Sequence, residues 1–292
     1  MKRLKNIIRN ININLRANRR IFWLITVLRV LVVLSMVRAI FNGNYNGAFV
    51  CLLSLLLFLV PSLMENGFNI HIPPVFEGSI YLFIYAAEIL GEINHFYAAI
   101  PGWDTILHTI NGFLAAAVGF SMIDLLNRNS KNISLSPFYL AMVAFCFSMT
   151  IGVLWEFLEF SADNLLHMDM QKDFIISSIH SVTLDPSHSQ HVVHIHDIIS
   201  TQLTTASGQT YTIDGGYLDI GIIDTMKDLF VNFIGAVCFS TLGYWMLRHK
   251  DRYSRAFASN FIWQAVPDET DESNYMLTSD GFTADDDDDS EK

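Results

Sequence analysis

Six long apolar segments, separated by short polar stretches, set the pattern of this chain. They lie at about residues 21–41, 48–64, 75–95, 105–126, 137–160 and 223–247. A helix needs about 20 mostly apolar residues to cross the hydrocarbon core of a bilayer. The pattern therefore predicts an all-α integral membrane protein with six transmembrane helices.

Residues 161–222 interrupt this pattern between helices five and six. The segment is too long for a simple connection. Alternating apolar and polar runs at 191–199, 202–205 and 209–213, with a turn at Ser207-Gly208, predict a small β-hairpin insertion.

The composition agrees with a membrane protein. The chain is 51% hydrophobic and 16% charged, whereas soluble domains carry about 25% charged residues. The net charge of −11 comes mainly from residues 268–292, which hold eleven acidic residues and one lysine. Residues 248–292 are predicted to form a disordered acidic tail. No basic patch with interleaved aromatic residues lies outside the N-terminus, which excludes nucleic acid as a partner.

The lysines and arginines predict the orientation in the membrane. Residues 1–20 contain seven basic residues and no acid, and Arg248, Lys250, Arg252 and Arg255 follow helix six. Loop 161–222 has Lys172 as its only Lys or Arg. Because Lys and Arg are enriched in cytoplasmic loops, we expect a multi-pass protein of the plasma (inner) membrane with both termini cytoplasmic and loop 161–222 outside.

Polar residues recur at helical spacing in four of the predicted membrane helices. In the orientation above, all of these faces lie at the outer ends of their helices. A carboxylate facing lipid costs about 2.5–3.5 kcal/mol on insertion scales, so we expect the faces to turn inward and converge in the outer leaflet. The residues are Glu88, Glu92 and His95 on helix three, Asp104, His108 and Asn111 on helix four, Glu156, Glu159 and Asp163 on helix five, and Asp224, Asp228 and Asn232 on helix six.

Three interpretations of this convergence stay open. Carboxylates and imidazole on facing helices suit a divalent metal ion, with Asp104, His108, Glu156, Glu159, Asp163, Asp224 and Asp228 as candidate ligands. Such an ion can activate water, as in a membrane hydrolase. The same groups could form a relay or ion path in a transporter, or a purely structural set of hydrated helix ends and caps. The sequence assigns no catalytic residue and no organic cofactor, and it identifies neither the ligand nor the oligomeric state.

Two further features accompany the cluster. Arg38, expected at the outer end of helix one, could neutralise part of it or bind an anionic headgroup. The run His191-x-x-His194-x-His196-Asp197 in loop 161–222 could bind a divalent ion. Its spacing on a strand puts only His194 and His196 on one face, so a solvated loop is the favoured interpretation.

Three blocks resemble a known family. They are FYAAIPGWDTILHTINGF at 96–113, GVLWEFLEFSAD at 152–163 and GGYLDIGIIDTMKDLFVNFIGA at 215–236. They resemble the YjdF-like family of uncharacterised polytopic bacterial membrane proteins. The resemblance implies a six-helix inner-membrane fold and supplies no activity. Its motif positions correspond to Asp104, His108, Gly112, Trp155, Glu156, Glu159, Asp163, Asp224, Asp228, Asn232 and Gly235.

Overall fold

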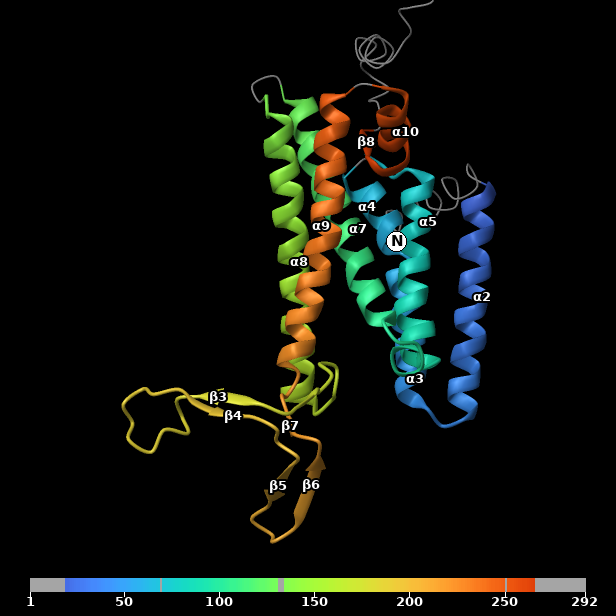
Figure 1. Cartoon of the computed structure of the whole chain (residues 1–292). Coiled ribbons are helices and arrows are strands. Elements are labelled where there is room, and N and C mark those ends of the chain that lie inside the picture. Colours follow the sequence, from blue (N-terminus) through green and yellow to red (C-terminus); the bar gives the residue numbers. More distant parts are fainter. Residues whose placement is uncertain (1–18, 69, 131–133, 250, 266–292) are drawn as a thin grey trace, which may run out of the picture. The chain divides into compact units, whose positions relative to one another are not determined.

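The computed structural model describes residues 19–68, 70–130, 134–249 and 251–265 (Figure 1). The predictions of a basic N-terminal segment and of an acidic tail fall largely on residues 1–18 and 266–292, which lie outside the described residues.

The described residues contain six helical segments that are long and apolar enough to cross a membrane. This confirms the predicted all-α membrane fold. The segments are Arg19–Phe41, Tyr45–Phe68, Pro74–Ile93, Trp103–Asn129, Pro137–Leu166 and Ile222–Arg248. The first is α2, the fourth α7, the fifth α8 and the sixth α9.

The second segment is broken in its middle. It consists of α3 (Tyr45–Leu57) and α4 (Val60–Phe68). Pro61 has no N–H to donate, and its ring crowds the carbonyl four residues earlier, on Leu57. α3 accordingly ends at Leu57. The side chain at the break, Phe58, is completely buried.

The third segment changes its helical type. It begins as the α-helix α5 (Pro74–Ile84) and continues as a wide π-helical stretch, η1 (Tyr85–Ile93). The sequence predicted one uniform helix here. π-Helical turns are rare and are found mostly as short stretches at functional sites, and η1 carries Glu88 and Glu92.

The chain divides into two compact units. The first contains the described residues of Met1–His95, Phe120–Pro137 and Trp245–Lys292. Its core joins α2, α3, α5 and η1. Phe58 and Tyr81 meet edge to face there, with ring centroids 5.6 Å apart. The buried core side chains are Ile25, Leu28, Val32, Cys51, Phe58, Tyr81, Ile84 and Ile89.

The prediction of disorder from residue 248 onward is wrong for residues 252–265. These form α10 (Arg252–Phe261) and the short strand β8 (Gln264–Ala265), which pairs antiparallel with β1 (Ile70–His71). The Asp251 carboxylate caps α10 by accepting from Ser254 N at 2.7 Å. Ile262 and Trp263 are buried, so apolar packing holds this segment although it is followed by an acidic stretch.

The second unit contains Phe96–Gly119 and Phe138–Tyr244. Within it α7, α8 and α9 make close contacts. A Cβ atom on Gly112 of α7 would lie 2.1 Å from the backbone O of Asn232 on α9, and one on Gly235 would lie 2.0 Å from Thr109 O. Small residues let membrane helices approach closely. Here they bring the backbones of α7 and α9 into direct contact.

A polar network ties the third helix, α8, to the other two. Asn232, which is completely buried, accepts from Asn111 Nδ2 at 3.2 Å and donates to Ser148 O at 3.4 Å. Ser148 Oγ donates to Gly112 O at 2.8 Å. One asparagine thus connects α7, α8 and α9.

The segment between α8 and α9 forms short antiparallel strand pairs, including the predicted hairpin (Figure 1). β5 (Ser200–Thr204) pairs with β6 (Thr210–Asp214), with Gln202 opposite Thr212. β3 (Ile179–Ser181) pairs with β4 (Val193–Ile195), and β2 (Ile175–Ile176) pairs with β7 (Tyr217–Leu218).

The connection from β3 to β4 is organised around Asp185, which is 4% exposed. Its carboxylate accepts hydrogen bonds from the backbone N–H groups of Ser187, Ser189 and His191 and from both serine hydroxyls. Hydrogen bonds from the hydroxyl and the backbone N–H of Ser187 are the main reason that the pKa of Asp185 lies well below its usual range. The carboxylate therefore stays ionised and keeps these bonds at any pH above the ordinary range of an aspartate.

Replacing Gly112 by alanine tests the contact between α7 and α9. The new methyl group would meet backbone atoms that cannot rotate away, so we expect a loss of about 1–3 kcal/mol in the free energy of unfolding. Thermal unfolding of the detergent-purified chain measures it. Gly67→Ala is the matched control, because a Cβ there meets no atom within 4 Å. Equal unfolding temperatures for the two variants would contradict the close contact.

Candidate functional site

The first turns of α7 present an acid and an imidazole on one face. Asp104 and His108 are one helical turn apart, and Asp104 Oδ1 lies 3.4 Å from His108 Nε2. The imidazole is largely buried, while the side chain of Asp104 is 30% exposed. A carboxylate in the first turn also interacts favourably with the helix dipole.

Asp228 of α9 completes a three-residue cluster. Its Oδ2 lies 3.8 Å from His108 Nε2, and its side chain is 2% exposed. One ligand atom from each of Asp104, His108 and Asp228 lies within 4.8 Å of the other two. The contact of α7 with α9 at Gly112 and Gly235 explains this proximity, because it leaves no side chain between the two backbones near His108.

Two buried glutamates of α8 extend the cluster. Glu156 is 4% exposed and Glu159 is 8% exposed, and both lie within electrostatic range of His108. Glu159 Oε1 accepts from Trp155 Nε1 at 2.8 Å. Among the residues that the structure describes, neither Glu156 Oε2 nor Asp228 Oδ1 has a hydrogen-bond partner, although both atoms are buried. Such oxygens are costly to leave unpaired.

The charges of this cluster do not balance. Asp224 is also in electrostatic range of His108, so five carboxylates surround one imidazole. Lys227 adds a second cation near Asp104 and Asp224. Two positive charges cannot neutralise five negative ones, and buried like charges repel unless some are protonated or a cation bridges them.

Asp163 and Asp224 have a different role from the other predicted ligands. Asp163 accepts from the backbone N–H groups of Met170 and Gln171, at 2.6 and 2.9 Å. Asp224 Oδ2 accepts from Lys172 N at 2.8 Å. These carboxylates therefore hold the start of the loop that follows α8.

Asp219 supports the same loop and was not singled out in the sequence. It accepts from Phe174 N at 2.7 Å and from Ile223 N in the first turn of α9 at 2.8 Å. Burial pushes its pKa upward, but the N–H donors of Phe174, Ile223 and Gly221 outweigh this and hold the pKa below its ordinary value. An aspartate three residues ahead of a long apolar helix is a recognisable start signal.

The remaining predicted residues lie elsewhere. Asn111 and Asn232 belong to the polar network between the helices, described above. Arg38, Glu88 and Glu92 belong to the first unit. There Arg38 Nη2 donates to Asn94 Oδ1 at 3.3 Å, Glu88 is half-buried and Glu92 is exposed. The convergence of helix three with the other three helices therefore stays a prediction.

Replacing Asp163 by alanine tests its role in the loop. Each hydrogen bond to a charged group contributes about 1.5–3 kcal/mol, so we expect amide exchange at Met170 and Gln171 to accelerate about tenfold or more. Asp169→Ala is the control, since its exposed carboxylate pairs with the side chain of Lys172. Unchanged exchange at both amides would contradict the assignment.

The comparison with known families agrees with the helical membrane fold. Residues 21–184 match the model of a family described as "Predicted membrane protein (DUF2238)". The match covers α2 to α8 with Asp104, His108, Glu156 and Glu159, and it ends before Asp228. No curated protein and no solved structure matches the chain. The chain belongs to this family of polytopic membrane proteins, whose function is unknown.

Proposed function

We propose that Asp104, His108 and Asp228 bind a divalent transition-metal ion inside the membrane, with Glu156 and Glu159 beside it. Two carboxylates and one imidazole suit Zn²⁺, Mn²⁺ or Fe²⁺. Zinc bound tetrahedrally at about 2.0–2.1 Å has ligands roughly 3.3 Å apart. The separation of 3.4 Å between Asp104 Oδ1 and His108 Nε2 is close to that value.

The observation that carries this proposal is the pair of buried, unpartnered oxygens on Asp228 and Glu156. A structural set of helix ends would be expected to satisfy its buried oxygens internally, as buried Asp224 does with Lys172 N. A dication would bind such oxygens and also offset the surplus of negative charge.

Polar residues of the first unit give less support to a transport path. Glu77 Oε1 accepts from Tyr81 OH at 2.9 Å, and Glu65 Oε1 accepts from Ile72 N at 2.8 Å. Asp124 forms an ion pair with Arg128, with 2.9 Å between Oδ2 and Nε. These acids are bound by neighbours within their own unit. This favours a site at one side of the membrane over a continuous row of acids that could pass an ion or a proton across it.

The reaction class that fits this site is hydrolysis of a lipid or envelope substrate. A divalent ion with three protein ligands would supply an activated water. Glu156 would be the group to accept a proton from it, since it is within electrostatic range of His108 and its buried Oε2 has no hydrogen-bond partner among the described residues. Asp104, the most exposed member of the cluster, lies on the side where a substrate could approach.

The location of the site follows from the basic residues. We place the chain in the plasma membrane with both termini in the cytoplasm, since loop 161–222 contains a single lysine while basic residues flank the first and last helices. The cluster then lies in the outer leaflet. Labelling of single cysteines introduced into loop 161–222 tests this orientation, and reactivity from the cytoplasmic side alone would overturn it.

Elemental analysis of the detergent-purified full chain tests metal binding. The parent for this experiment carries alanine at His180, His194 and His196, so that histidines of the loop contribute no metal. We expect about one equivalent of Zn, Mn or Fe in the parent and little in its Asp228→Asn and His108→Ala variants, because each removes a ligand.

Glu92→Gln serves as the matched control, because it removes an exposed carboxylate of the first unit. Thermal unfolding of every variant separates loss of metal from loss of fold. The proposal fails if the folded parent holds no stoichiometric metal even after incubation with Zn²⁺ and Mn²⁺. It also fails if folded Asp228→Asn and His108→Ala proteins retain as much metal as the parent.

A further inference from the structure

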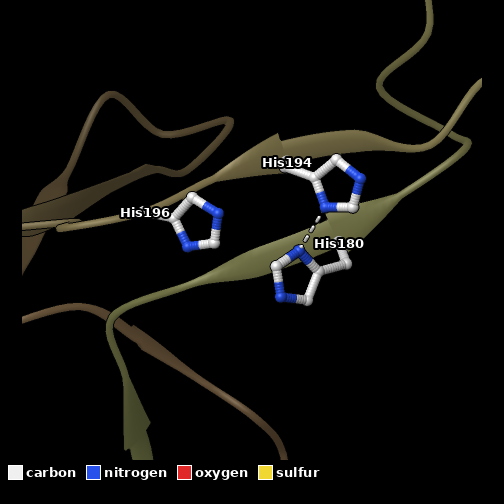
Figure 2. A group of neighbouring side chains, drawn as sticks. All are labelled: His180, His194 and His196. Atoms are coloured by element: carbon white, nitrogen blue, oxygen red, sulfur yellow. Dashed lines mark hydrogen bonds between the residues drawn. The ribbon is translucent and has the colours of Figure 1, made fainter.

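Three histidines lie on one face of the β3–β4 strand pair. His180 of β3 stands directly opposite His194 of β4 in the antiparallel register. His196 lies directly after the last residue of β4, and its ring lies 5.2 Å from the ring of His180. Figure 2 shows the three rings near one another, with His180 on β3, His194 on β4 and His196 on the chain that continues from β4.

The rings are close enough to share one ion. Their centroids are 4.9 Å apart for His180 and His194, 5.2 Å for His180 and His196, and 6.4 Å for His194 and His196. The Nδ1 atoms of His180 and His194 are 2.9 Å apart and share a hydrogen bond. One ring nitrogen from each residue lies within 4.8 Å of the other two.

Packing does not account for this arrangement. All three side chains are exposed, so they remove little apolar surface from water. Three neighbouring imidazoles also repel one another whenever more than one is protonated. A bound cation would turn this unfavourable grouping into a coordination site.

The loop that connects the two strands fixes their register. Asp185 accepts hydrogen bonds from the backbone N–H groups of Ser187, Ser189 and His191. These bonds hold the connection between β3 and β4 in a compact turn. The two strands therefore hold His180 against His194 without needing an ion to bring them together. A site whose ligands are already in place loses less conformational entropy on binding.

The surroundings also favour a cation. Lys172 is the only lysine or arginine in residues 161–222, and its Nζ interacts with Asp169. No carboxylate belongs to the group of three, which disfavours Ca²⁺ and Mg²⁺, because those ions prefer oxygen ligands. Imidazole nitrogens suit Zn²⁺, Cu²⁺ and Ni²⁺.

We propose that His180, His194 and His196 form a surface site for one borderline divalent ion, with Zn²⁺ as its expected occupant. Three imidazoles leave one coordination position of a tetrahedral Zn²⁺ for water or for a donor from another molecule. The site is distinct from the Asp104–His108–Asp228 cluster, because it shares no residue with it and lies on the β3–β4 strand pair and the residue that follows it, not on helices. Its ligands are nitrogen alone, whereas the helical cluster offers mainly oxygen.

Titration of the full chain in detergent with ZnCl₂, followed by calorimetry, tests this site. In the Asp228→Asn variant we expect one equivalent of Zn²⁺ to bind at the hairpin. Adding His180→Ala, His194→Ala or His196→Ala should weaken this binding at least tenfold. CaCl₂ should give no saturable binding in the same protein.

The matched control is His191→Ala, which removes a histidine of the same loop outside the group of three. We expect it to leave Zn²⁺ affinity within about twofold, because it retains its backbone N–H bond to Asp185. Amide exchange across β3 and β4 shows whether each variant keeps the strand pair. Visible absorption of Co²⁺, used as a spectroscopic substitute, reports nitrogen coordination directly.

Two results would overturn the proposal. One is the absence of saturable Zn²⁺ binding in a protein whose β3–β4 amides remain protected. The other is an equal loss of affinity in His191→Ala and His194→Ala. Failure of the helical metal centre would be seen separately, as unchanged metal content after Asp228→Asn in the protein that lacks the three loop histidines.

Discussion

The backbone contact between α7 and α9 is the constraint on which the rest of the second unit depends. Gly112 and Gly235 lie where any side chain would collide with the opposite helix. Without a hydrophobic driving force between helices in lipid, close packing and polar contacts decide how they associate. The same approach that satisfies Asn232 also brings His108 toward Asp228. The packing of α7 against α9 and the grouping of their polar side chains therefore depend on the same contact.

The acidic residues near the C-terminal end of α8 and the N-terminal end of α9 divide into two groups. Asp163, Asp219 and Asp224 accept hydrogen bonds from backbone N–H groups of the loop that follows α8, at Met170, Gln171, Lys172 and Phe174. Asp228 and Glu156 are buried with an oxygen that no described residue satisfies. The first group stabilises the connection to the strands. The second group supplies the oxygens on which the proposed metal site depends.

Much of this arrangement could be predicted from the sequence because it depends on local periodicity. The six segments, the pairing of Asp104 with His108 at one helical turn and the hairpin around Ser207-Gly208 are all short-range patterns. Features that depend on distant contacts were missed. The loop amides that Asp163 and Asp224 bind lie seven or more residues away along the chain, and α10 is stabilised by Ile262 and Trp263 in spite of the acidic residues beyond it.

The group of three histidines could not be predicted from local spacing either. Spacing along one strand could place His194 beside His196, but His180 comes from the neighbouring strand, fourteen residues earlier. Only the register of β3 with β4 makes it a third member. His191, which the sequence pattern included, contributes its backbone N–H to Asp185 instead.

The break between α3 and α4 has a consequence for the backbone of the second span. At 1.5 Å per residue, the 13 residues of α3 extend about 20 Å and the 9 residues of α4 less, so the span needs both pieces to cross roughly 30 Å of hydrocarbon. Irregular backbone at that depth is tolerated only where protein covers it. Phe58 lies at the break and packs on Tyr81 of α5. A side chain of the third span therefore shields the interrupted backbone of the second from lipid.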